Sequence, residues 1–203
     1  MKRKVLFHVL LLSLILNLTA KVNAEQFWPP QVGRTFPTIE FVDQNGISFK
    51  MSELYGSVVL VEYVGMTCRA CQAYSGGNEV GGYKNISPIG GLPSIEKLFK
   101  DNTNISLDDS RIKFVQVLLY SMTMDSPTPD HASNWANHFG FDRYNDEIVV
   151  VPKRDLRGKG SYNLIPGFQI LDKQLVVQRD STGHSPRHNL YSELFPLVKI
   201  LLK

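Results

Sequence analysis

The sequence predicts a single α/β domain of mixed strands and helices. Two runs rich in β-branched and aromatic residues, 57–64 and 113–120, have the composition of buried central strands. The tail from Leu190 to Leu202 places apolar residues three and four positions apart, which is typical of an amphipathic helix. With 203 residues, 43% of them hydrophobic, the chain is long enough to bury one core, and it shows neither an internal repeat nor a second core.

An export signal is expected ahead of this domain. Met1–Lys4 is cationic, Val5–Leu18 is largely apolar, and the small residues that end at Ala24 have the form of a cleavage site. The apolar run is short for a membrane span. We therefore expect residues 1–24 to be a cleaved signal peptide and residues 25–203 to work in the periplasm or outside the cell, with retention as an anchor as the alternative.

Charge and composition exclude two classes of protein. The formal net charge is +3, but Lys2, Arg3, Lys4 and Lys21 all lie in the predicted signal, so the remainder is nearly neutral. A neutral body argues against a nucleic-acid binder that depends on phosphate contacts. Aromatic residues reach 10% and charged residues only 20%, which excludes a disordered chain.

Local patterns predict the elements in chain order. A hairpin is expected within Phe36–Lys50, turning at Asp43-Gln44-Asn45-Gly46. The elements expected after it are a helical turn at 52–55, a strand at 57–64, a strand-to-helix turn at 66–74, a helix at 94–100, a strand at 113–120, a helix at 130–139, a strand at 147–151, a hairpin of 167–171 and 174–178, and a final helix that Pro196 kinks or splits.

Three Gly-Gly pairs, at 76–77, 81–82 and 90–91, interrupt the segment after the strand-to-helix turn. They are expected to end that helix early, within an insertion spanning about residues 75–112. A phosphate-binding loop is excluded, because no Gly-Lys-Ser/Thr follows. A flexible loop and a lid over the neighbouring Cys68 both remain open.

The chain has two cysteines, and they form a C-x-x-C pair, Cys68 and Cys71. A disulfide that closes so small a loop is a poor structural staple, which favours a redox or metal-binding role. On a helix the two side chains share a face, and at the helix N-terminus the free N–H groups, together with Arg69, favour a thiolate on the first cysteine. Cys68 is therefore predicted to attack and Cys71 to resolve the mixed disulfide. A zinc site would need distant histidines.

Two further positions are candidates for the same chemistry. Glu62 lies in a strand that is otherwise apolar, where a carboxyl is either salt-bridged or a buried acid of raised pKa that exchanges protons with Cys71. Ile165-Pro166 precedes the strand at 167–171. It is either a simple strand start or a cis peptide that packs on the cysteines and offers the Ile165 backbone to a substrate strand.

These residues resemble a known family. Val59-Leu60-Val61-Glu62-Tyr63-Val64-Gly65-Met66-Thr67-Cys68-Arg69-Ala70-Cys71 resembles the active-site strand and turn of thioredoxin, and Ile165-Pro166 resembles its cis-proline loop. The pattern Phe36-Pro37…Phe41…Asp43…Gly46…Leu54-Tyr55-Gly56 is similar to the N-terminal hairpin of exported thioredoxin-like thiol–disulfide oxidoreductases, which peroxiredoxins share. The resemblance implies a thioredoxin fold: a central mixed sheet with helices on both faces, an N-terminal β-hairpin and, here, an insertion after the C-x-x-C helix.

Carried over by position, the resemblance makes Cys68 the nucleophile, Cys71 the resolving thiol, Glu62 the buried acid and Pro166 the cis-proline. Two departures concern redox direction and partner: Thr67 replaces the usual tryptophan, and Arg69-Ala70 lacks the usual proline. The expected function is a thiol–disulfide oxidoreductase whose redox-active disulfide, Cys68–Cys71, needs no further cofactor or metal. Its expected partners are the thiols and disulfides of exported proteins and a membrane or soluble recycling thiol, with no nucleic acid.

Two other functions are alternatives for the C-x-x-C pair, and its redox direction depends on the neighbouring residues. A copper-binding chaperone of the cytochrome-oxidase assembly type shares the resemblance, but usually spaces its cysteines one residue wider and adds a histidine, for which His184 is the candidate. A peroxiredoxin-like peroxidase would have threonine where Gly65 stands. Arg69 and the missing proline favour an oxidising couple. The family hairpin favours a reductase, which is the direction we expect.

Overall fold

The structure is a computed structural model that describes residues 28–158 and 160–203. The predicted signal peptide and its cleavage site at Ala24 lie outside these residues. None of the helices within the described ranges is long and apolar enough to cross a membrane.

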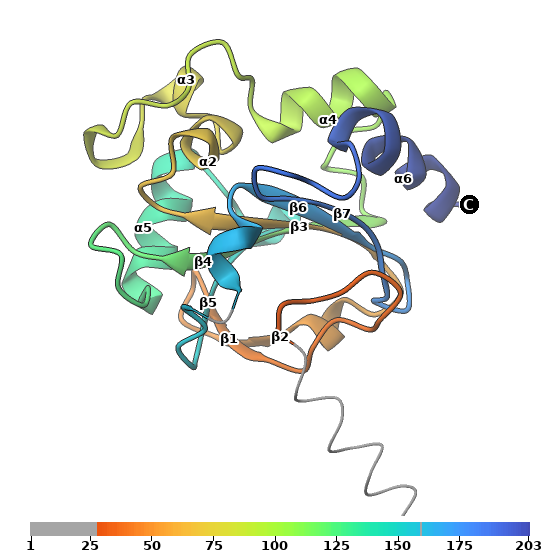
Figure 1. The fold of residues 1–203 in the computed structure, drawn as a ribbon, viewed down its shortest axis with the longest axis horizontal. Helices are drawn as coiled ribbons and strands as arrows, with labels where there is room; N and C mark the ends of the chain where they lie inside the picture. The colour runs from red at the N-terminus through yellow and green to blue at the C-terminus, as the bar shows by residue number, and fades with distance from the viewer. Residues whose placement is uncertain (1–27, 159) are drawn as a thin grey trace, which may run out of the picture.

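A mixed sheet of seven strands forms the centre of the domain (Figure 1). The strands are β1 (Glu40–Asp43), β2 (Ser48–Lys50), β3 (Val58–Gly65), β4 (Ile112–Tyr120), β5 (Glu147–Pro152), β6 (Gly167–Leu171) and β7 (Val177–Thr182). Their order across the sheet is β2-β1-β5-β4-β3-β6-β7, with β3, β4 and β5 parallel and the other neighbours antiparallel. Every residue of β3 is buried, as its nearly continuous apolar run predicts.

Within residues 28–158 and 160–203, five α-helices and several shorter helical turns surround the sheet. The α-helices are α2 (Arg69–Tyr74), α3 (Gly77–Val80), α4 (Ile95–Thr103), α5 (Pro129–Phe139) and α6 (Phe195–Leu201). The shorter helices are η1 (Met51–Leu54), η2 (Tyr83–Asn85), η3 (Arg143–Asn145), η4 (Ser161–Leu164) and the π-helical turn η5 (Leu190–Leu194).

Different segments of the chain pack against the two faces of the sheet. Along β3, Val58 and Leu60 point toward the cluster formed with α4 and α6, whereas Val61 and Tyr63 point to the opposite side. In the view of Figure 1, α2, α4 and α6 lie above the sheet, and the segment 28–39 and η1 lie below it. Both faces therefore bear helical segments, α-helices on one and the 3-10 helices η1 and η4 on the other.

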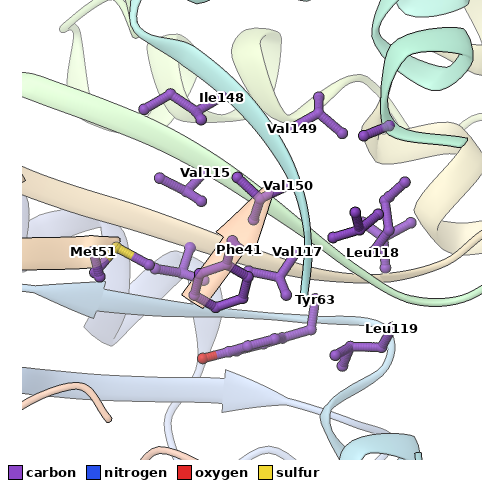
Figure 2. Packing of buried hydrophobic residues seen from close by; sticks show 14 of the residues in the cluster. Phe41, Met51, Tyr63, Val115, Val117, Leu118, Leu119, Ile148, Val149 and Val150 are labelled. Carbon is purple, nitrogen blue, oxygen red and sulfur yellow. The ribbon is translucent and has the colours of Figure 1, made fainter. Parts of the chain in front are cut away.

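Tyr63 lies within the core of this second face. Figure 2 shows its ring close to Phe41 and Val117, with Met51 of η1 beside Phe41. The Tyr63 hydroxyl donates to Gln169 Oε1 at 2.6 Å, so that the polar end of the ring is satisfied although it is buried. Trp28 packs edge-on against the same ring at 6.0 Å between centroids. The side of β3 that faces away from α2 is thus closed by aromatic packing.

The glycine-rich segment folds against the helices. α2 ends at Tyr74, and Gly76 follows in the left-handed conformation at φ 101°, so the early helix end is confirmed. Tyr83 then packs edge-on against Trp135 of α5 at 5.5 Å, and its backbone N–H donates to Gln72 Oε1 of α2 at 2.7 Å. The insertion is therefore tied to both α2 and α5 by specific contacts.

The predicted elements are otherwise found close to their expected positions, with one shift. The last strand was expected at 174–178, but β7 begins at Val177. Asp172 Oδ1 accepts the N–H groups of Gln174 and Val176, at 2.9 and 3.0 Å, and Leu175 takes a positive φ of 61°. This wide turn delays the strand. Pro196 splits the final helix as expected, lying in the first turn of α6 directly after η5.

Gly167 couples the sheet to the Pro166 loop, and its substitution provides a test. A Cβ at this position would lie 2.3 Å from Thr182 Cα and 2.8 Å from the carbonyl oxygen of Leu164. We expect Gly167→Ala to lower the free energy of unfolding by about 1–3 kcal/mol, because β6 and β7 must move apart. Gly90→Ala is the control, since nothing lies within 4 Å of its Cβ position. Urea unfolding measures both, and equal effects would contradict the steric argument.

Candidate active site

Cys68 lies where β3 passes into α2, as the strand-to-helix pattern predicts. It is the N-cap residue of α2, with extended backbone angles, and its N–H donates to the Gly65 carbonyl at 2.9 Å. The N–H of Cys71 donates to Cys68 Sγ at 3.3 Å. The Cys68 side chain is partly exposed and that of Cys71 is buried, and both are free thiols. A molecule in solution can therefore reach the Cys68 sulfur but not the Cys71 sulfur.

The two thiols differ in proton affinity. Hydrogen bonds from the Cys71 thiol, and then from the N–H groups of Cys71 and Ala70, lower the pKa of Cys68 to about 7 against the opposing effect of partial burial. Burial, followed by the neighbouring Cys68, raises the pKa of Cys71 well above its ordinary value. Near neutral pH the accessible thiol is therefore the better nucleophile, which is the division of roles expected from the sequence.

Arg69 does not contribute as expected. Its guanidinium binds the insertion: Nε and Nη2 donate to the carbonyls of Ser87 and Pro88, at 2.9 and 3.4 Å. The lowered pKa of Cys68 has its causes in Cys71 and the backbone of α2, and Arg69 is not one of them. The expectation that Arg69 stabilises the Cys68 thiolate is wrong because this cation holds the insertion instead.

Glu62 is fully buried on β3, and among the ion pairs of the described residues none includes it. This excludes the salt-bridged alternative for that part of the chain. Burial raises the Glu62 pKa to about 8, the hydrogen bond from Gln116 opposes the rise, and the charge of Cys68 adds to it. Glu62 also raises the pKa of Cys71, so the carboxyl and the resolving thiol are coupled electrostatically.

A buried hydrogen-bond chain holds this carboxyl. Gln116 of β4 lies opposite Glu62 in the parallel register, and its Nε2 donates to Glu62 Oε2 at 2.7 Å and to Ser75 Oγ at 2.9 Å. Trp135 Nε1 donates to Gln116 Oε1 at 2.9 Å. The sequence analysis missed these partners. The available signal was a single amide within the apolar run of β4, facing the single acid of β3.

The Ile165-Pro166 peptide bond is cis, which confirms that part of the interpretation. Gly65 separates Ile165 from Cys68, because a Cβ on Gly65 would lie 3.5 Å from Ile165 Cδ1 and 3.8 Å from Cys68 Cβ. The loop therefore packs beside the attacking thiol. The Ile165 N–H already donates to the Tyr162 carbonyl at 3.2 Å.

A cavity of about 340 Å³ opens beside Cys68. It is lined by Gly65, Thr67, Cys68, Tyr120, Met124, Tyr162, Ile165, Pro166 and His184. Met124 is held over it by Thr67, whose hydroxyl donates to Met124 Sδ at 3.5 Å, and by Arg157, which donates to the Met124 carbonyl at 2.9 Å. No residue of the glycine-rich segment 75–92 lines this cavity. The lid over Cys68 is therefore not present in the structure.

Three of the histidines take different positions. His184 lines the cavity that also contains Cys68. His131 accepts the Thr128 N–H at the start of α5, and His138 contacts the Gly81 carbonyl of the insertion. Within the described residues, no three His, Cys, Asp or Glu side chains gather closely enough to hold a metal ion.

Comparison with known proteins identifies the fold. No family model and no curated protein matches the sequence. Solved structures do match. The thioredoxin domain of a thiol-disulfide oxidoreductase from Bacteroides vulgatus is 16% identical, with a TM-score of 0.50 over 83% of this chain and 98% of that one. A putative protein disulfide isomerase from Bacteroides thetaiotaomicron is 12% identical, with a TM-score of 0.52 over 86% and 92%.

A third match comes from a different group of proteins. A SCO1/SenC family lipoprotein from Bacillus anthracis str. Ames is 15% identical, with a TM-score of 0.53 over 85% of this chain and 100% of that one. Similarity at these identities concerns the backbone arrangement. Together with the mixed sheet, the thiol pair at the start of α2 and the cis-proline beside it, the comparisons show that the chain has the thioredoxin fold.

Proposed function

We propose that this protein is a thiol–disulfide oxidoreductase that reduces disulfides of exported proteins. The observation that carries the proposal is the asymmetric thiol pair: an accessible Cys68 whose pKa is about 7 and a buried Cys71 whose pKa is raised. The cavity beside Cys68 and the cis-proline loop provide space for an extended chain next to the attacking sulfur. The export of its partners follows from the predicted signal peptide.

The proposed reaction has two exchange steps. The Cys68 thiolate attacks a substrate disulfide, so that a Cys68–substrate disulfide forms and the other substrate sulfur leaves as a thiolate. Cys71 then loses its proton to Glu62, and its sulfur attacks Cys68. The Cys68–Cys71 disulfide forms and the second substrate thiolate leaves. The substrate has gained two electrons and the protein has lost two, so a recycling dithiol, or two thiols, of the compartment must supply two further electrons to reduce the Cys68–Cys71 disulfide.

Glu62 is suited to act at the second step. Burial is the main cause of the raised Glu62 pKa, and the negative charge of Cys68 adds a smaller part of the rise. That charge disappears when Cys68 enters the mixed disulfide, and the Glu62 pKa then falls. The carboxyl therefore becomes easier to ionise at the moment when Cys71 needs a base.

The reducing direction rests on what stabilises the Cys68 thiolate. A couple becomes oxidising when the reduced form is stabilised, above all by a strongly lowered thiol pKa. Here Arg69 is committed to Ser87 and Pro88, and the Cys68 pKa falls only to about 7. This removes the Arg69 part of the argument for an oxidising couple and leaves the part that rests on the missing proline.

A copper-binding role of the cytochrome-oxidase assembly type has one observation in its favour, since His184 shares the cavity with Cys68. The described residues provide no three-ligand group of the kind such a site needs. We therefore do not adopt this role. Tight stoichiometric Cu(I) binding by the reduced protein, lost in His184→Ala, would reverse that choice.

Substitution of each cysteine tests the reaction. We expect Cys68→Ser to lower insulin disulfide reduction at least about 100-fold and to trap no partner, because the attacking thiolate is absent. Cys71→Ser is the matched control, since it keeps the attacking sulfur and should accumulate mixed disulfides with exported proteins. Full activity of Cys68→Ser would refute the proposal.

The reduction potential of the Cys68–Cys71 couple tests the direction. We expect a value closer to that of thioredoxin, about −270 mV, than to the roughly −120 mV of the strongest oxidants of this fold. Equilibration with glutathione buffers and mass spectrometry of the two states provides the measurement. A potential above the poise of the compartment would make the protein an oxidant.

The rate of alkylation should follow the thiolate of Cys68. The Cys68 pKa is lowered to about 7, so the rate with iodoacetamide should rise with pH and reach half its maximum near that value, whereas Cys71 stays unreactive. In Cys71→Ala the midpoint should move up by about one pH unit, because the thiol hydrogen bond is lost. Arg69→Gln is the control and should leave the midpoint unchanged; the reverse pattern would show that the cation sets it.

A further inference from the structure

The indole of Trp135 determines which way the Gln116 amide points. Trp135 is fully buried in α5, and its Nε1–H can only donate a hydrogen bond. The partner 2.9 Å away must therefore be the oxygen of Gln116, Oε1. The amide nitrogen is then directed to Glu62 Oε2 and Ser75 Oγ, at 2.7 and 2.9 Å. The opposite amide orientation would set two donors, Nε2–H and the indole N–H, against each other.

This fixed orientation has a consequence for the Glu62 carboxyl. Oε2 accepts a hydrogen from Gln116 in either protonation state, so a proton on Oε2 would face another N–H. The proton of the neutral acid therefore belongs on Oε1. Among the buried side-chain atoms of the described residues, Glu62 Oε1 is the one without a hydrogen-bond partner. The proton is thus placed on the oxygen that no protein acceptor holds.

We propose that Trp135, acting through Gln116, is a positioning residue that fixes the Glu62 proton on Oε1 and keeps it available for exchange with Cys71. The proposal deepens the proposed oxidoreductase function and rests on it for the role of Cys71. The effect of Trp135 on the carboxyl passes through two hydrogen bonds.

The surroundings of Glu62 offer few alternatives. The titratable groups coupled to it are Cys68, Cys71 and Tyr74, all on or next to α2. The neighbouring strands contribute uncharged side chains at the paired positions, Gln116 on β4 and Phe168 on β6. The Gln116 donor is accordingly the hydrogen bond that favours the ionised carboxylate. Without the indole donor the amide is free to flip, and its oxygen could then hold a proton on Oε2.

Infrared spectroscopy of the reduced protein tests the proton position directly. At about pH 6, below the Glu62 pKa of about 8, the C=O stretch of the neutral carboxyl is the band that Glu62→Gln removes. With the proton on Oε1, the C=O oxygen is Oε2, and the Gln116 hydrogen bond lowers its frequency. We expect the band to move to higher wavenumber in Trp135→Phe and in Gln116→Met. An unchanged band in either variant would overturn the proposal.

Packing must be separated from hydrogen bonding. Phe139 packs edge-on against the same indole at 4.7 Å between centroids, so Phe139→Leu disturbs the packing of Trp135 but leaves its N–H in place. This control should lower stability and leave the carboxyl band where it is. A band shift in Phe139→Leu equal to that in Trp135→Phe would assign the effect to packing. If Trp135→Phe fails to fold, Gln116→Met and Phe139→Leu still decide the question.

Resolution kinetics test the link to Cys71. A mixed disulfide of Cys68 with thionitrobenzoate releases its coloured thiolate when Cys71 attacks, and the rate can be followed against pH. In Trp135→Phe and Gln116→Met, we expect the midpoint of this profile to rise by about one pH unit, a tenfold change in proton affinity, because a donor to the carboxylate is lost. Phe139→Leu should keep the wild-type midpoint.

The two measurements separate the claims. A shifted band with an unshifted kinetic midpoint would overturn the coupling to Cys71 while leaving the proton position in place. A wild-type protein that reduces no disulfide, yet shows the band shift, would sink the proposed function and not the placement of the proton.

Discussion

Parallel pairing of β3 with β4 is the constraint on which the site depends. This register sets Glu62 beside Gln116 in the middle of the sheet and brings both strand ends to one edge. The chain leaving β3 becomes the Cys68 turn, and the chain leaving β4 carries Tyr120 and Met124 to the cavity beside it. A shift of one residue would turn Glu62 to the other face and separate the carboxyl from the thiols. The chemistry of the site is thus an outcome of strand register.

The electrostatics of the thiol pair come from short-range donors. The Cys68 thiolate is favoured by the Cys71 thiol and by N–H groups at the first turn of α2, within a partly buried setting. Such hydrogen bonds are fixed by the fold of the turn, whereas a flexible surface cation would be screened by salt. Arg69 instead fastens the insertion to α2. The insertion therefore stabilises the scaffold without lining the cavity beside Cys68, so that Cys68 stays accessible.

Much of this arrangement could be predicted from the sequence because it depends on local signals. The strand at Val58–Gly65, the turn at Cys68 and the cis-proline at Pro166 each have a pattern within a few residues. The direction of Arg69 and the role of Trp135 depend on contacts between segments far apart in the chain, Arg69 with Pro88 and Trp135 with Gln116. Periodicity marks Trp135 as a core residue, but it says nothing of the partner that its N–H meets.

The fastening of Met124 has a consequence for the mouth of the cavity. Arg157 joins two loops there. It forms ion pairs with Asp155 at 2.9 Å and with Asp125 at 3.3 Å, and it donates a hydrogen bond to the Met124 carbonyl. These ion pairs lie in solvent, while the cavity walls are mainly aromatic and aliphatic. A rising concentration of a kosmotropic salt such as sulfate screens the former and strengthens burial in the latter. In such a salt the ion pairs at the entrance weaken, while the cavity binds an apolar side chain more strongly.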